Sequence, residues 1–509
     1  MTSINSHQVV TDLTNPSRDT LLLMLVFVIS AVLNYSYNLA MGWLLSPDQY
    51  GMLGVTISFL SILSLFVGAA FPLTVAKFLS EDNENVIKQR VFKSSLIGNL
   101  CMALLVSSLF YALYASGIIR LDSAYRPFVL FIILAMVFSS VGGVYTSALQ
   151  GMFRFKKYGL IGIATATTKL ICAVLLVLLG LGAIGAFLGL IAAAITGMLL
   201  AVAFTADFKY WKTGGWVDKK IYSFAFPMFF GTFFMTLLMN IDLLGVKFLS
   251  EDVLSDTLTG YYRSALILAE LPVFVVGALM GAMFPYISRY SSTINDYSSK
   301  TLKYTVLVIF PVSITLFVIP SSMIALVFPP SYAAAANALG ILALGMGFFV
   351  IITALTGIFQ AMHRPKVPAI ILMFSVVIDV IALLFLVPEY GILGAAASTT
   401  IACAAGLLGL AGVYSKYNSF RLSYKNAVKI LMAFILFGSL IYIVPHETRF
   451  LTFFDLVFSA ALYLLILFVF GLLKDDDIKI ILTGFNFGNN EIIEKIIRGV
   501  KSLNQLSKW

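Results

Sequence analysis

The sequence predicts an all-α fold, that of a polytopic membrane protein with fourteen transmembrane helices. The first observation is composition: of 509 residues, 60% are hydrophobic and 11% are charged, and the mean hydropathy is +0.98. Ordinary soluble domains carry about 25% charged residues. The second observation is that apolar residues fall in runs of about 20, the length with which a helix crosses a bilayer. A β-barrel would instead alternate apolar and polar residues in segments of about ten.

The apolar runs define the spans in chain order. The first run follows a polar tail, exceeds a signal-peptide core and lacks a small-residue cleavage site, so it is kept as a span. The predicted spans are 21–45, 51–72, 94–115, 127–150, 159–180, 183–205, 223–249, 262–285, 304–323, 335–361, 367–387, 391–414, 427–444 and 451–473.

Positive charge orients these spans. If the amino terminus is cytoplasmic, the inner segments hold most of the 33 lysines and arginines, and the outer segments hold only Arg120, Arg126 and Arg449. The positive-inside bias therefore predicts a multi-pass protein of the plasma membrane with both termini in the cytoplasm. The net charge of +9 is accordingly an orientation signal, and we expect no nucleic-acid partner.

An internal repeat divides the chain. TSALQGMFRFKKYG at 146–159 resembles TGIFQAMHRPKVPA at 356–369, and GAAFP at 68–72 resembles GAMFP at 281–285. Each unit has an even number of spans, so we expect two six-helix lobes related by a pseudo-twofold axis along the membrane normal. The predicted parts are a tail (1–20), an N-lobe (21–212), a C-lobe (213–424), two extra spans (425–473) and a tail with an amphipathic interfacial helix (474–509).

Several motifs between residues 44 and 270 carry, in their order, a similarity that runs over about the first 420 residues. They are LLSPDQYGMLG (44–54), FPLTVAKFLSE (71–81), LQGMFRFKKYGLIGI (149–163), GLGAIGAFLGL (180–190) and TGYYRSALILAE (259–270). Together they resemble the polysaccharide-type (oligosaccharidyl-lipid) flippases of the multidrug/oligosaccharidyl-lipid/polysaccharide exporter superfamily. The resemblance implies transport of a polyprenyl-(pyro)phosphate-linked oligosaccharide from the inner to the outer leaflet by alternating access. The substrate, membrane lipids and glycan-assembly enzymes would be its partners in cell-surface polysaccharide or glycan assembly.

Lys169 lies near the middle of the fifth predicted span, about 15 Å deep. A cation at this depth costs about 2.5–3.5 kcal/mol, so some partner must offset it. The repeat maps Lys169 onto Ile378 or Asp379 in span eleven. We expect Lys169 and Asp379 to face the space between the lobes, where Lys169 attracts the carrier phosphate and Asp379 pairs with it in the absence of substrate. The alternative is a structural pair or hydrogen bond buried within one lobe.

Spans seven and eight carry a second set of ionisable residues. Arg263 and Glu270 are seven residues apart and so share a helix face. Asp242 or Glu270 would bind a proton or sodium ion for coupling, or would merely neutralise Arg263. Lys247 lies near the outer interface and is expected to extend its ammonium group toward the headgroups. Arg263 would either do the same or contact the substrate.

Four further residues are candidate substrate contacts. Tyr37 and Asn38, with Asn34 and Tyr35 nearby, make the middle of span one polar and suit sugar hydroxyls, although helix packing explains them equally well. Lys77 and Arg289 follow the paired FP elements and would collect an anionic headgroup at the cytoplasmic mouth. Positive-inside anchoring is the alternative for both.

Other functions fit less well. A cation-coupled multidrug or small-molecule antiporter of the same superfamily, the main alternative, is expected to have about twelve spans and an acidic residue in span one, which has none. Peptidoglycan-precursor flippases have arginines in span one, and this chain has none there. The connecting loops are too short for a catalytic domain, so we expect no enzyme. The three cysteines form neither a metal motif nor a disulfide framework, so no cofactor or metal is expected, and we predict a monomer.

Overall fold

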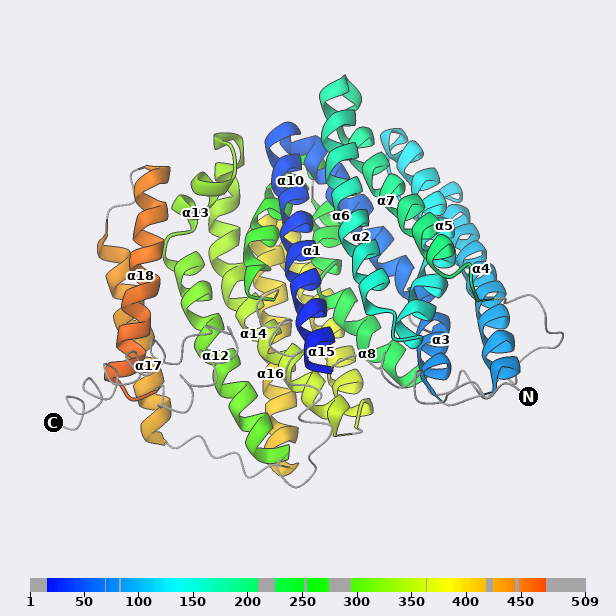
Figure 1. Ribbon diagram of the computed structural model, residues 1–509. Helices are drawn as coiled ribbons and strands as arrows, with labels where there is room; N and C mark the ends of the chain where they lie inside the picture. The colour runs from blue at the N-terminus through cyan, green and yellow to red at the C-terminus, as the bar shows by residue number, and fades with distance from the viewer. Residues whose placement is uncertain are drawn as a thin grey trace.

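The computed structural model describes residues 16–68, 70–81, 84–208, 225–250, 254–273, 294–362, 364–417, 424–444 and 448–472. This part of the chain is helical and contains no strand (Figure 1). Ten of its helices are long and apolar enough to cross a membrane, or eleven if the bent pair Phe229–Leu238 and Ile241–Leu249 is one span. The all-α membrane fold is confirmed. The number of fourteen spans, the pseudo-twofold axis and the domain boundaries stay predictions, and the amphipathic tail lies outside the described residues.

The N-terminal bundle has a helix at each of the predicted spans one to six, although the helix of span three begins nine residues early, at Asn85, and a separate short helix follows span two. Its elements are α1 (Pro16–Leu44), α2 (Pro47–Gly68), α3 (Ala70–Ser80), α4 (Asn85–Ala115), η1 (Ser123–Tyr125), α5 (Arg126–Gly151), α6 (Phe155–Leu176), η2 (Val177–Leu181) and α7 (Gly182–Phe204). Helix α1 packs on α6, α5 packs on both α4 and α7, and α2 touches α5. The apolar runs therefore set both the existence and the approximate ends of these helices.

Helices α6 and α7 form a hairpin at the GLGAIG motif. Gly180 has φ +89° and Gly182 has φ +52°, a region that residues with side chains rarely adopt. The turn brings α7 back along α6, where a Cβ on Gly189 would lie 2.6 Å from the Ala173 Cβ. The continuous helical stretch 155–204 thus supplies two of the predicted spans.

The C-terminal bundle has helices at the described parts of spans seven to twelve, although those of spans eight and nine begin at Ser255 and Ile294, against predicted starts of 262 and 304. Its elements are α8 (Ala225–Leu238), α9 (Ile241–Leu249), α10 (Ser255–Ala269), α12 (Ile294–Val318), α13 (Pro320–Val327), η5 (Pro330–Ala335), α14 (Ala336–Ala361), α15 (Lys366–Tyr390) and α16 (Ile392–Tyr417). The predicted seventh span is bent by 44° between α8 and α9. Proline at the first position of α13 separates it from α12, because a proline nitrogen has no hydrogen to continue the helix ladder.

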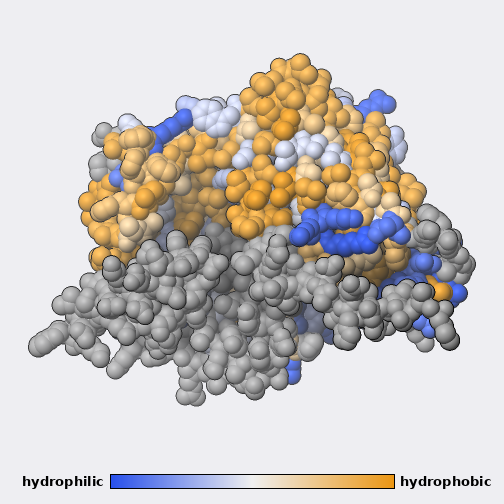
Figure 2. All heavy atoms as spheres, viewed as in Figure 1, coloured by the Kyte–Doolittle hydropathy of each residue, from blue (hydrophilic) through white to orange (hydrophobic). Residues whose placement is uncertain are grey.

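Two further helices, α17 (Tyr424–Ile443) and α18 (Arg449–Val469), stand at the edge of the molecule beside α12 and α13 (Figure 1). Phe310 and Phe434 stack with ring centroids 4.1 Å apart, and the Tyr463 hydroxyl donates to the Leu307 carbonyl at 2.7 Å. The outward faces of α17 and α18 are strongly apolar: Phe450 is 72% exposed. Apolar residues dominate the described surface in Figure 2, as expected of helices that face lipid.

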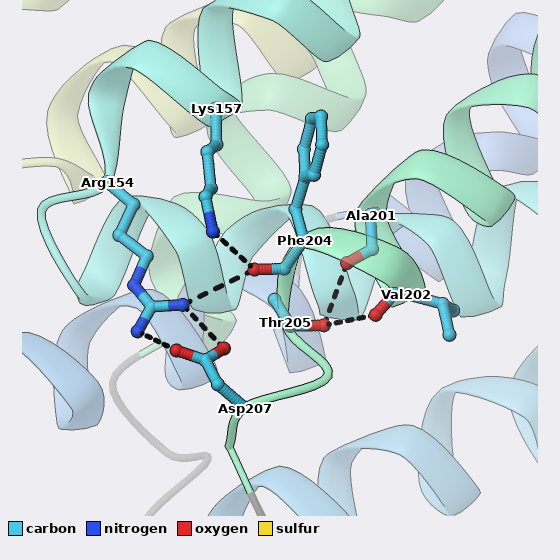
Figure 3. A network of polar contacts seen from close by, with 7 residues as sticks. All are labelled: Arg154, Lys157, Ala201, Val202, Phe204, Thr205 and Asp207. Carbon is cyan, nitrogen blue, oxygen red and sulfur yellow. Dashed lines mark hydrogen bonds and ion pairs between the residues drawn. The ribbon is translucent and has the colours of Figure 1, made fainter.

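At the predicted cytoplasmic end, the FRFKK motif ties α6 to the end of α7 (Figure 3). Arg154 makes a bidentate pair with Asp207, with one Nη1–Oδ1 distance of 2.7 Å. Arg154 and Lys157 also donate to the Phe204 carbonyl at 3.3 and 3.2 Å. The last carbonyls of a helix lack intrahelical partners and carry negative partial charge, so cations stabilise them. Arg154 also holds the pKa of Asp207 below its usual range.

Candidate substrate and cation sites

The two bundles meet in backbone contact where α10 lies along α2. A Cβ added to Gly260 would lie 1.8 Å from the Pro47 carbonyl oxygen, and one added to Gly51 would lie 1.9 Å from the Asp256 carbonyl oxygen. No side chain fits at either position without moving a helix. By the predicted topology this contact is at the outer end, so glycine at both positions lets that end close tightly.

A cluster of polar residues, here called the outer cluster, surrounds this contact. Lys247 on α9 donates to Asp256 Oδ1 at 2.8 Å and Ser255 Oγ at 3.0 Å, and lies 3.5 Å from Asp122 Oδ2. The Tyr125 hydroxyl also donates to Asp256. Since Asp122 and Tyr125 belong to the N-terminal bundle, the cluster joins the two bundles. The expectation that Lys247 extends to the headgroups is wrong. Its side chain is only 4% exposed, because Asp256 and Asp122 bind its ammonium group.

The outer end of α1 also contacts the C-terminal bundle. The Trp43 indole donates to the Val327 carbonyl at 2.7 Å, and the Tyr332 hydroxyl donates to the Leu45 carbonyl at 3.3 Å. Arg449 at the start of α18 stacks over Trp43, with its Cζ 5.0 Å from the ring centroid. These contacts join the two bundles at the end that the predicted topology places outside.

Lys169 on α6 is held by α1 rather than by an acid. Its ammonium group donates to the Asn34 side-chain oxygen and lies 4.5 Å from the centroid of the Tyr37 ring. The other side of the Asn34 amide donates to the Ser30 carbonyl at 2.7 Å, which fixes its orientation. The cost of a buried cation is therefore offset by an amide dipole and an aromatic face, and both leave the lysine charge uncancelled.

Arg263 reaches the same helix from the opposite bundle. Its Nη2 lies 3.5 Å from Asn38 Oδ1, at the limit of a hydrogen bond, and the residue is 9% exposed. The arginine stem packs beside Gly54, where a Cβ would lie 3.3 Å from Arg263 Cγ. The Asn38 amide in turn donates to the Asn34 carbonyl at 3.1 Å. Asn34 and Asn38 lie on successive turns of α1, and each thus contacts one cation, the two cations coming from different bundles.

These two cations act on each other electrostatically. Like charges repel, and the low effective dielectric constant of a protein interior strengthens this repulsion. An anion between Lys169 and Arg263 would turn this repulsion into attraction. We call Lys169, Arg263, Asn34 and Asn38 the central anion site.

Glu270, at the end of α10, lies near this site. It is an electrostatic neighbour of Arg263, Tyr35 and Tyr50, which agrees with the expected shared face. Among the described residues, however, Glu270 forms no ion pair with Arg263.

The other acidic groups form a separate pair inside the C-terminal bundle. Asp242 is fully buried, and its Oδ2 accepts from the Tyr262 hydroxyl at 2.6 Å and the Thr399 hydroxyl at 3.1 Å. Its Oδ1 accepts from the Leu243 amide at 2.7 Å. Asp379 on α15 is an electrostatic neighbour of Asp242. Asp242 therefore does not neutralise Arg263, and its donors are hydroxyl and amide groups.

Asp379 is also fully buried, but neither of its oxygens accepts a hydrogen bond of good geometry from the described residues. The Ser398 hydroxyl approaches it while donating to the Ala395 carbonyl at 2.8 Å. The expected pairing of Asp379 with Lys169 is not formed in the described structure. Two buried carboxylates that interact electrostatically repel each other, so a proton or metal cation bound to both would be stabilising.

The remaining predicted site residues contribute less. Tyr37 is buried and its hydroxyl donates to the Ala186 carbonyl at 3.2 Å, so only its ring serves Lys169. Lys77 is exposed, 5.7 Å from the ring of Phe78, and its role at the mouth stays a prediction. Arg289 lies outside the described residues. Within the described part, no group of three or more histidine, cysteine or acidic residues gathers to hold a metal ion.

Tyr262 and Thr399 were not identified as site residues from the sequence. In the sequence both look like ordinary buried residues of membrane helices. Their hydroxyls become site groups only because α9, α10 and α16 converge, which lets both donate to Asp242. A signal for Tyr262 was present: it is the residue directly before Arg263 in the YYRSA motif.

Relatives and solved structures agree with this fold. The chain is 29% identical over 131 residues to an uncharacterized membrane protein of Methanocaldococcus jannaschii, covering 25% of each chain. It is 24% identical over 211 residues to the probable low-salt glycan biosynthesis flippase Agl15 of Haloferax volcanii, covering 39% of this chain and 43% of that one. These matches thus span less than half the length of either relative.

The solved structure of the lipid II flippase MurJ in an inward closed conformation has the same fold. It superposes with a TM-score of 0.70 at 17% identity, covering 88% of this chain and 98% of that one. The family model for polysaccharide biosynthesis proteins matches residues 17–291, more than half of the chain. The protein therefore belongs to the polysaccharide biosynthesis protein family.

Proposed function

We propose that the protein is a flippase that moves a polyprenyl-(pyro)phosphate-linked oligosaccharide from the inner to the outer leaflet of the plasma membrane. The observation that carries this proposal is the central anion site, where Lys169 and Arg263 from opposite bundles converge on adjacent turns of α1. A phosphate group is doubly suited to this site, because it cancels the repulsion of the two cations and accepts several hydrogen bonds from them. The names of the Haloferax and MurJ relatives support this substrate class.

Alternating access follows from where the bundles touch. With the outer end closed by the glycine contact and the outer cluster, the anion site is loaded from the cytoplasmic side. Separation of α2 from α10 at the outer end would then release the headgroup outward. The polyprenyl tail stays in lipid throughout, along apolar faces such as those of α17 and α18. The protein performs this transport as a monomer without catalysis, with both termini cytoplasmic and with glycan-assembly enzymes as partners.

The carboxylate pair supplies a coupling site in this scheme. Asp242 and Asp379 would bind a proton or a sodium ion, since both favour buried carboxylate oxygens and neither requires a cluster of three acids. Cation binding at this pair would bias the bundles toward one conformation.

Flipping by the reconstituted full-length protein tests the proposal. We expect Lys169→Ala and Arg263→Ala each to slow flipping of a fluorescent polyprenyl-linked sugar about 10- to 150-fold, the effect of losing a charged hydrogen bond. Lys169→Arg should retain most activity. The matched control is Lys156→Ala, which removes an exposed cytoplasmic lysine. Undiminished flipping by Lys169→Ala and Arg263→Ala would remove the anion site from the mechanism.

The second candidate is a cation-coupled multidrug antiporter, and the carboxylate pair is the observation that favours it. The same pair would bind the driving ion, while the two central cations would repel a cationic drug. Cation-driven efflux of a fluorescent organic cation from proteoliposomes, with no flipping of lipid-linked sugar, would establish the antiporter instead.

A further inference from the structure

Adjacent residues of α10 touch two different sites. Tyr262 donates to Asp242 in the carboxylate pair, and Arg263 lies against Asn38 in the central anion site. Consecutive side chains point about 100° apart on a helix, so one helix turn can serve both sites at once. Tyr262 and its neighbours on α10 are almost entirely buried, and α10 is packed between α2 and α14. A shift of α10 would therefore move both side chains together.

We propose that Tyr262 is a positioning residue that makes phosphate binding at the central anion site depend on cation occupancy of the carboxylate pair. This inference rests on the proposed function. Each carboxylate oxygen offers about two lone pairs, and those of Asp242 Oδ2 are taken by Tyr262 and Thr399. A metal cation or proton that binds Asp379 together with Oδ2 of Asp242 competes for them, whereas Oδ1 keeps its bond to the Leu243 amide. The Tyr262 hydroxyl is then released, and α10 loses one of the contacts that fix its position.

The direction of the coupling follows from the contacts. With the carboxylate pair empty, the Tyr262 bond holds α10 where Arg263 meets Asn38, next to Lys169, and phosphate binds best. Cation binding frees α10 and weakens the phosphate site. By thermodynamic linkage, phosphate binding must weaken cation binding by the same factor. A flippase coupled in this way releases its passenger when the cation arrives.

Thr399 provides a matched control. Its hydroxyl donates to the same Asp242 oxygen as Tyr262, but it lies on α16 and also donates to the Ala395 carbonyl of its own helix. Thr399→Val and Tyr262→Phe each remove one donor from Asp242 with little change of shape. Only Tyr262→Phe cuts the connection to α10.

The test measures binding of a fluorescent polyprenyl phosphate to full-length protein in nanodiscs, with and without saturating sodium and at acidic and alkaline pH without sodium. In wild type, we expect sodium or protons to weaken phosphate-lipid binding about 5- to 150-fold, the usual range of coupling between sites. In Tyr262→Phe, the factor by which the cation weakens phosphate-lipid binding should fall to about one, while the protein still binds the cation alone and the lipid alone. Thr399→Val should require less cation, because one donor that competes for Asp242 Oδ2 is gone, but keep the wild-type factor at saturation.

The outcomes separate the inference from the function on which it rests. Coupling that persists in Tyr262→Phe, or that Thr399→Val abolishes equally, overturns the role of Tyr262 and leaves the flippase standing. Wild-type protein that binds the lipid with no cation effect, or with tighter binding in the presence of cation, overturns the coupling alone. Failure of wild type to bind the lipid overturns both proposals.

Discussion

Replacing Gly260 by alanine should prevent full closure of the outer end. The new Cβ would lie 1.8 Å from the Pro47 carbonyl oxygen, whereas a carbon–oxygen contact needs more than about 3 Å. Both partners are backbone, so α10 and α2 must separate by more than about 1 Å. Overpacking of this kind costs about 1–3 kcal/mol, which shifts a two-state equilibrium about 5- to 150-fold. We expect Gly260→Ala to favour outward-open protein by that factor.

Spin labels on the two bundles measure this shift. Ile118 and Leu254 are exposed at the outer ends of the N-terminal and C-terminal bundles, and cysteines there, in a background without the native cysteines, accept labels. The distance distribution should move to longer values in Gly260→Ala. Gly412→Ala is the control, because a Cβ on that helical glycine meets nothing within 4 Å. An unchanged distribution in Gly260→Ala, or the same change in both variants, would refute the reasoning.

Three further predictions concern charged groups. Lys247→Met leaves Asp256 without its cation, which should destabilise the protein by about 3–5 kcal/mol and open the outer end to a membrane-impermeant thiol reagent; adding Asp256→Asn should restore part of the stability in thermal unfolding. Asp379→Asn removes a charge that lacks partners, so we expect an unchanged or higher melting temperature together with loss of the sodium or pH dependence of flipping. Arg154→Ala should raise the pKa of Asp207 toward its ordinary value, observable by NMR titration. Because the pKa of Asp207 is depressed in the folded protein, the Arg154–Asp207 pair stabilises the fold at pH values above the pKa of the unfolded state. This contribution is lost as the pH falls through the pKa of the folded state. At this exposed site the pair contributes about 0–1 kcal/mol.

The helices were predictable because long apolar runs leave the backbone no alternative in a membrane. Helix α5 begins at Arg126 and ends at Gly151, against a predicted span of 127–150. The bend between α8 and α9 was not predicted, because the sequence there contains neither proline nor a polar break long enough to end the apolar run.

The residues of the site were predicted better than the contacts between them. Lys169, Arg263 and Asn38 were chosen because polar groups within spans are costly, and the structure brings them together. The partner of Lys169 was misjudged: an internal repeat relates equivalent positions of two bundles, but it does not make their side chains face each other. Asp379 instead interacts electrostatically with Asp242, which lies in the same bundle.

The structure of the protein with a bound polyprenyl phosphate tests the central anion site most directly. We predict phosphate density within hydrogen-bonding distance of both Lys169 Nζ and the Arg263 guanidinium, beside Asn34 and Asn38 of α1. Phosphate density elsewhere, with these two cations contacting only the asparagines and Tyr37, would contradict the account.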